Sequence, residues 1–175
     1  MSMKRLAVSG LAAFTLAAGA QTTVPAPVSV IGFAPCTDYK LATYEQIADY
    51  FRALAASTDR MELLEIGETS EGRTHLMAII SSEANMQRLD RFKAVARRLA
   101  TARGLTDAQA RELAADGRAV VWIDFGLHST EVGHAQTAPI MAHRAVTDDS
   151  PEMRFIRDNV IFLLVPNMNP DGTTL

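Results

Sequence analysis

The sequence predicts an α/β fold, a three-layer sandwich in which helices cover both faces of a mixed, mostly parallel sheet. Segments with strand-like and helix-like patterns alternate along the 175 residues, which is typical of such layered folds. Two strand segments, "RAVVWIDFG" (118–126) and "NVIFLLVP" (159–166), are almost continuously apolar. Runs of this kind indicate strands that are covered on both faces.

The first 20 residues have the pattern of a secretory signal peptide. A basic start at Met1–Arg5 precedes an apolar run from Leu6 to Ala17, and Ala18-Gly19-Ala20 fits the small-x-small cleavage rule. The apolar run is too short to cross a bilayer comfortably. We therefore expect a secreted or periplasmic protein without stable membrane insertion.

An extended arm is predicted for residues 21–38, which are rich in proline and poor in charge. Cys36, the one cysteine of the sequence, lies in this arm and has no partner for an internal disulfide. We interpret it as an incidental residue of the arm.

The elements after the arm follow from caps and periodicity. A helix is expected to start near Thr43, where Thr-x-x-Gln offers a capping box. "MELLEIG" and "HLMAIIS" predict two strands joined by the turn "ETSEGRT". A long helix is predicted for about 83–103, and Thr106 opens a shorter one that Gly117 ends.

The second half continues the alternation. After the strand at 118–126, "EVGHAQTAPIMAHRAV" (131–146) has a helical pattern. Ser150 is a predicted N-cap with Pro151 at the first helical position, and this helix is expected to end near Arg157. The strand at 159–166 then leads into the turn "NMNPDG".

His128 and Glu131 are the candidate functional residues. They lie three apart where a buried strand gives way to a helix, and ligands of open α/β sheets bind beyond the carboxyl ends of strands. An imidazole nitrogen and a carboxylate oxygen suit Zn²⁺. Asp124, in the strand just before, is a candidate partner that orients His128. By spacing alone the alternative stays open that His128 caps the strand and Glu131 only decorates the helix start.

Three motifs in this order resemble those of the zinc metallocarboxypeptidase family, the carboxypeptidase A/B type. They are "GETSEGR" between two early strands, with Ser70 one place later than the usual spacing, the His128/Glu131 pair after an apolar strand, and "NPDG" (169–172) after the next. The resemblance covers about 39–175. It implies that this segment is the N-terminal part of a zinc carboxypeptidase-like catalytic domain, with His128 and Glu131 as zinc ligands.

The same resemblance implies zinc-dependent hydrolysis of peptide bonds, usually by removal of a C-terminal residue. In the family, the third zinc ligand, the general base and the arginine that binds the substrate carboxylate all lie downstream of the "NPDG" turn. We therefore expect no catalytic residue within the chain, a fragment with an incomplete sheet, and an exposed apolar face. The other histidines are interpreted as surface or packing residues. His134 is expected on a different helix face from Glu131, His143 lies more than two turns further on, and His75 begins a strand.

Thr130 stands where many family members carry an arginine that touches substrate, so it is a candidate substrate-binding residue. Its lack of charge leaves other functions open. One is a zinc-dependent amidase, deacylase or cell-wall peptide hydrolase of the same fold, and another is an inert secreted binding domain. The motifs around Glu68, Glu71 and Arg73 and at "NPDG" are interpreted as tight turns.

Composition excludes some partners. The formal net charge of −3 and the absence of a Lys/Arg stripe argue against binding to nucleic acid. The basic stretch "RFKAVARRLATAR" (91–103) is interpreted as the solvated face of a helix. The partner that the resemblance to zinc metallocarboxypeptidases implies is a peptide or peptide-like substrate.

Overall fold

The computed structural model describes residues 23–174, and the predicted signal peptide lies outside them. The helices are α1 (Pro27–Ile31), α2 (Tyr44–Ala55), α3 (Glu83–Met86), α4 (Leu89–Thr101), α5 (Asp107–Asp116), α6 (Val132–Thr147), α7 (Pro151–Asn159) and α8 (Pro170–Thr174). The strands are β1 (Met61–Glu68), β2 (Thr74–Ile80), β3 (Ala119–Asp124) and β4 (Val160–Val165).

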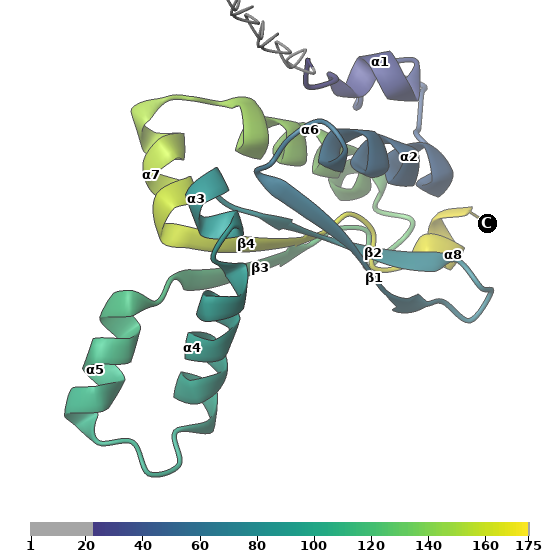
Figure 1. The fold of residues 1–175 in the computed structure, drawn as a ribbon. Coiled ribbons are helices and arrows are strands. Elements are labelled where there is room, and N and C mark those ends of the chain that lie inside the picture. Colours follow the sequence, from purple (N-terminus) through teal and green to yellow (C-terminus); the bar gives the residue numbers. More distant parts are fainter. Residues whose placement is uncertain (1–22, 175) are drawn as a thin grey trace, which may run out of the picture.

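The four strands form a mixed sheet in the order β1-β2-β4-β3. β2 pairs antiparallel with both β1 and β4, whereas β3 and β4 are parallel. Helices α2 and α6 lie on one side of this sheet and α4 extends from the other (Figure 1). The predicted α/β sandwich with a mixed sheet is therefore confirmed. The expectation that the sheet is mostly parallel is wrong for the described strands, because two of their three pairings are antiparallel.

Alternation along the strands buries apolar side chains on both faces of the sheet. The larger core joins α2 and α6 to the sheet, with Phe51, Leu54 and Leu164 fully buried. The smaller core on the other face packs Ile79 and Ile161 against the start of α4. Helices thus cover both faces, as the fold class requires.

Two helices begin as their sequences predict. Thr43 and Thr106 both form complete capping boxes, in which the threonine hydroxyl accepts from the backbone N–H three residues on and the glutamine there accepts from the threonine N–H. The expected helix N-termini at these two threonines are confirmed.

Two predictions of local structure are wrong. The long helix expected for about 83–103 is broken between α3 and α4, because Arg88 leaves the helical conformation at φ −116° and ψ 16°. The arm at 21–38 is not extended throughout, since it contains α1. Pro27 starts this short helix, Gly32 ends it in the left-handed conformation, and Ile31 packs into the larger core.

β3 is less covered than its apolar sequence predicts. Val120 and Trp122 keep 51% and 49% of their surface exposed. Within residues 23–174, β3 pairs with β4 alone, and so it is an edge of the described sheet. The expectation of a strand covered on both faces is wrong for β3 here, while the expected exposed apolar face is observed.

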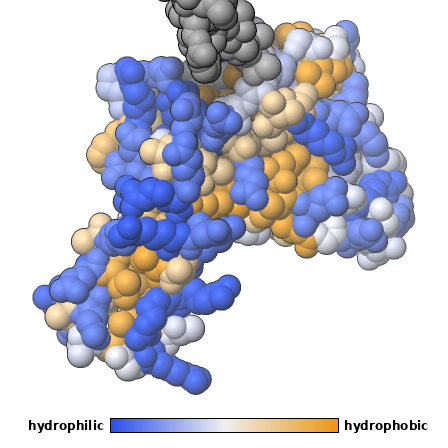
Figure 2. Space-filling view, viewed as in Figure 1, coloured by the Kyte–Doolittle hydropathy of each residue, from blue (hydrophilic) through white to orange (hydrophobic). Residues whose placement is uncertain are grey.

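The segment between β2 and β3 extends away from the rest of the chain. α4 and α5 run side by side as a helical hairpin (Figure 1), with hydrophobic residues gathered between them (Figure 2). Arg91 joins the two helices through the Asp116 carboxylate, with its Nε 2.9 Å from Oδ2. No helix within residues 23–174 is long and apolar enough to cross a membrane.

Candidate metal centre

The backbone joint after β3 sets the position of the predicted site. The Phe125 N–H donates to the Val165 carbonyl at 3.0 Å, and the Met168 N–H donates to the Phe125 carbonyl at 2.7 Å. Gly126 then takes the left-handed conformation at φ +65°. A Cβ at Gly126 would lie 2.7 Å from the Cγ of Asn167, which is fully buried. Glycine is therefore required where the chain turns out of the sheet.

The turn that follows brings the predicted ligand pair together. The Glu131 N–H donates to the His128 carbonyl at 3.0 Å, which closes the turn. His128 Nδ1 then lies 3.1 Å from Glu131 Oε2. Both side chains are more than half exposed, at 70% and 63%, so an ion and a substrate have access to them.

Glu131 occupies the N-cap position of α6, but its carboxylate makes no hydrogen bond to the helix backbone. The interpretation that Glu131 only decorates the helix start is thus less favoured than a role toward a ligand. The N-terminus of α6 contributes partial positive charge next to this carboxylate.

A third residue joins the pair, and the sequence interpretation of it is wrong. His134 Nε2 lies 3.3 Å from the same Glu131 Oε2, and His134 Nδ1 accepts a hydrogen bond from the Gly126 N–H at 2.9 Å. His134 therefore shares a face with Glu131. The spacing of three between Glu131 and His134 was the signal for this contact, because residues three apart on a helix are neighbours.

The two imidazoles affect the charge of Glu131. The hydrogen bond from His134 and then that with His128 hold the pKa of the Glu131 carboxyl below its usual value, against a smaller opposite effect of burial. The carboxylate is therefore ionised at neutral pH and suited to a cation.

The geometry of His128 and Glu131 fits two ligands of one zinc ion. Donor atoms at about 2.1 Å from a tetrahedral zinc lie about 3.4 Å apart, close to the 3.1 Å between His128 Nδ1 and Glu131 Oε2. Within residues 23–174, no group of three or more His, Cys, Asp or Glu side chains is arranged to hold a metal. The described residues thus offer His128 and Glu131 as a pair of ligands, and the place of a third ligand stays a prediction.

The other two predicted site residues have different outcomes. Asp124 accepts a hydrogen bond from Trp122 Nε1 at 2.9 Å, because residues two apart on a strand share a face. His128 directs its Nδ1 at Glu131 instead, so the structure does not support Asp124 as its orienting partner. Thr130 is exposed in the turn, and its contact with substrate stays a prediction.

The "NPDG" motif packs directly against the turn from His128 to Glu131, which is called the metal turn below. A Cβ at Gly172 would lie 2.6 Å from the Ser129 Oγ and 2.7 Å from the Asn169 amide nitrogen. The backbone of α8 therefore approaches the turn between His128 and Glu131 as closely as glycine allows. The sequence analysis did not single out Asn167. Its side chain packs against Gly126, where the chain enters the metal turn.

The "ETSEGR" turn is joined to the "NPDG" motif. The Asp171 carboxylate accepts from the Thr69 hydroxyl at 2.7 Å, the Arg73 guanidinium at 2.8 Å and the Glu71 N–H at 3.2 Å. Gly72 takes a positive φ of 77° in this turn. The interpretation of "ETSEGR" as a turn agrees with the structure. The interpretation of "NPDG" as a turn is wrong, because Pro170 starts the short helix α8 and Asp171 and Gly172 lie within it. The structure in addition places the three motifs in a chain of contacts at one end of the sheet.

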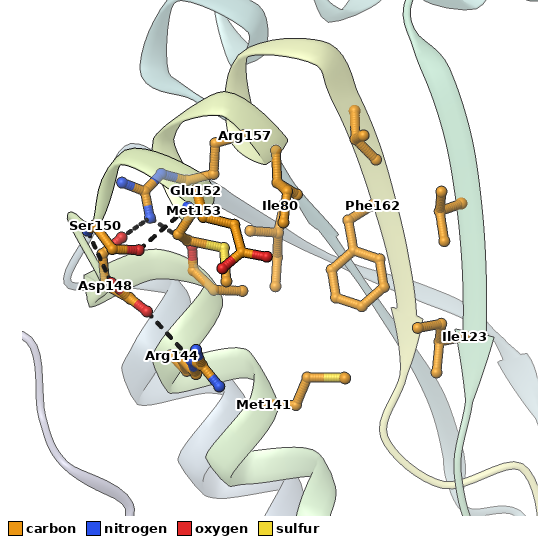
Figure 3. A pocket seen from close by; sticks show the side chains of 14 residues that line it. Ile80, Ile123, Met141, Arg144, Asp148, Ser150, Glu152, Met153, Arg157 and Phe162 are labelled. Atoms are coloured by element: carbon orange, nitrogen blue, oxygen red, sulfur yellow. Dashed lines mark hydrogen bonds and ion pairs between the residues drawn. The ribbon is translucent and has the colours of Figure 1, made fainter.

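A separate apolar groove lies away from these motifs. It has a volume of about 410 Å³ between β3, β4, α6 and α7 (Figure 3). Apolar side chains line most of it, and the Arg144–Asp148 ion pair lies at its edge. The groove borders Val121 and Ile123 inside β3, whereas His128 follows the end of that strand. None of its lining residues belongs to the metal turn, so we do not assign it a role in the site.

Comparison with known proteins agrees with the motifs. Residues 47–175 match the model of a family described as zinc carboxypeptidase. A search of curated proteins found no match.

Three solved structures illustrate the similarity in fold. Carboxypeptidase A from Helicoverpa armigera is 20% identical, with a TM-score of 0.55 over 84% of this chain and 31% of that one. A metallo-carboxypeptidase from Burkholderia cenocepacia is 22% identical, with a TM-score of 0.52 over 77% of this chain and 29% of that one. Thrombin activatable fibrinolysis inhibitor is 12% identical, with a TM-score of 0.57 over 88% of this chain and 31% of that one. The chain thus spans less than a third of these structures, which establish its fold.

Replacing Gly126 by alanine is expected to destabilise the fold by about 2 kcal/mol or more, because the new Cβ meets Asn167 and favours a different φ. Urea unfolding of the full chain measures the change. Gly133→Ala in α6 is the matched control, since nothing lies within 4 Å of its Cβ position. That control is expected to keep or raise stability by up to about 1 kcal/mol. Equal effects of the two substitutions would contradict the packing at Gly126.

Asp171→Asn is expected to flatten the acid dependence of stability. The Thr69 hydroxyl and then the Arg73 guanidinium and the Glu71 N–H hold the Asp171 pKa below its usual value, against an opposing effect of burial. The folded-state pKa is thus below the unfolded one, so this stabilisation is present above the unfolded pKa and is lost as pH falls through the folded pKa. The variant is less stable at neutral pH and loses less between about pH 5 and pH 2.

Unfolding curves at several pH values test this, with Asp38→Asn as the control that makes the same charge change at an exposed position. A wild-type acid dependence in Asp171→Asn would show that the carboxylate does not tie the turns together.

Proposed function

Because the chain belongs to the zinc carboxypeptidase family, we propose that it is part of a secreted or periplasmic zinc-dependent peptidase that removes C-terminal residues from peptides. The observation that carries this proposal is the 3.1 Å approach of His128 Nδ1 to Glu131 Oε2 at the end of β3. An exposed imidazole and an ionised carboxylate at this separation suit one divalent cation.

The residues of this chain have distinct parts in the proposal. His128 and Glu131 hold the metal, and Gly126 with Asn167 fixes the turn that carries them. A zinc ion held here would polarise a peptide carbonyl and lower the pKa of a water molecule. The general base, the third ligand and the arginine for the substrate carboxylate are proposed to come from chain beyond Leu175.

Hydrolysis of N-acyl amino acids or cell-wall peptides is the second candidate. Thr130, exposed between the two ligands, carries no charge, so the turn itself supplies no cation for a terminal carboxylate. Cleavage that requires a free C-terminal carboxylate favours the first candidate. Equal cleavage of a peptide and its C-terminal amide favours the second. A chain that binds no zinc favours the inert binding domain.

The metal role predicts that His128→Ala and Glu131→Ala each weaken zinc binding to the purified full chain by at least about tenfold. Each removes one of two ligands. Titration of the metal-free chain against a colorimetric zinc chelator measures the dissociation constants.

His143→Ala is the control, because His143 lies on the same helix α6 but makes no contact with the pair. An affinity that is unaffected by His128→Ala would refute the assignment. Circular dichroism of each variant excludes unfolding as the cause of a loss.

A further inference from the structure

His134 is the one imidazole near the metal turn that the proposed function does not use. Its side chain is 37% exposed and lies between the Gly126 backbone and the Glu131 carboxylate. Three roles are open to such a residue: it packs at the surface, it is itself a metal ligand, or it positions Glu131.

The hydrogen bond from Gly126 decides which ring nitrogen carries the proton. A backbone N–H can only donate, so His134 Nδ1 must be the acceptor at 2.9 Å. With Nδ1 as the acceptor, the ring proton is on Nε2. That proton faces Glu131 Oε2, 3.3 Å from Nε2.

This arrangement leaves His134 without a lone pair for a metal. Nδ1 is occupied by the Gly126 N–H, and Nε2 bears the proton that Glu131 accepts. A metal ligand must present an unprotonated, unoccupied nitrogen. The ligand role is thus excluded by the same contacts that define the tautomer.

The Gly126 backbone is a rigid support for the imidazole. The Phe125 backbone is hydrogen-bonded to Val165 and Met168 on the β4 side, and Gly126 itself packs against the buried Asn167. The hydrogen bonds therefore run from the end of the sheet through Gly126 and His134 to the Glu131 carboxylate.

We propose that His134 is a positioning residue that holds the Glu131 carboxylate in place for the metal through a hydrogen bond from its Nε2–H. The inference rests on the proposed function for its metal, but the hydrogen bonds belong to the chain alone. Glu131 is 63% exposed, and an exposed glutamate samples several rotamers unless a partner selects one.

His134 differs from His128 in this respect. His128 Nδ1 faces Glu131 as well, but a ligand imidazole must give up the proton on its donor nitrogen. The His134 contact uses a proton that ligand formation does not remove. It is therefore the contact that keeps Glu131 ordered in both the metal-free and the metal-bound chain.

Two NMR measurements on the metal-free full chain test the hydrogen bonds. Imidazole ¹⁵N shifts are expected to show His134 protonated on Nε2 and unprotonated on Nδ1, and a coupling across the bond is expected between the Gly126 amide nitrogen and Nδ1. A proton on Nδ1 overturns the proposal, and so does the absence of that coupling.

Zinc titration then tests the positioning. His134→Ala is expected to weaken zinc binding about tenfold, as loss of a partner that orients a ligand does. His134→Gln retains an acceptor for Gly126 and a donor for Glu131, so it is expected to stay close to the wild-type chain. His143→Ala is the control on the same helix.

Two outcomes of this titration overturn the proposal. An affinity of His134→Ala equal to that of His143→Ala assigns His134 to surface packing. A loss in His134→Gln as large as in His134→Ala assigns the imidazole itself to the metal. If the wild-type chain binds no zinc, the proposed function fails, and the two NMR measurements alone decide whether His134 holds Glu131.

Discussion

The joint between the end of β3 and the end of β4 is the constraint on which the site depends. Two backbone hydrogen bonds from Phe125 and Met168 lock these strand ends together, and Gly126 crosses the buried Asn167 without room for a side chain. The chain must therefore leave the sheet in one direction. That direction determines where the turn bearing His128 begins and how α6 starts.

From this joint, contacts between short turns assemble the rest of the site. The backbone at Gly172 closes against Ser129 in the metal turn, and Asp171, the next residue back, holds the turn between β1 and β2. Each contact joins residues that are distant in the sequence, and all of them meet at one end of the sheet. The motifs that are far apart in the sequence are thus parts of a single surface.

Two carboxylates at this end of the sheet, those of Asp171 and Glu131, have lowered pKa values for different reasons. The partners of each carboxylate indicate whether it serves the fold or a ligand. Asp171 is held first by the Thr69 hydroxyl and also pairs with the guanidinium of Arg73, which Glu71 shares. Glu131 is held first by the hydrogen bond from His134 and then by that with His128, and among the described residues no arginine or lysine pairs with it. Asp171 is therefore satisfied within the chain, while Glu131 retains negative charge for a cation.

The sequence by itself determined the strands and most of the helices, with their order, because caps, apolar runs and turn residues act over a few neighbours. Thr43 and Thr106 cap helices whatever surrounds them, and the spacing of His128 and Glu131 across a strand-to-helix turn brings their side chains within contact. Tertiary structure decided what depends on distant partners. The break at Arg88, the exposure of Val120 and Trp122 and the pairing of Asp124 with Trp122 could not be predicted from local pattern. His134 shows the reason most directly: its proton is placed by a backbone N–H from the end of another element, and no sequence pattern encodes that distance.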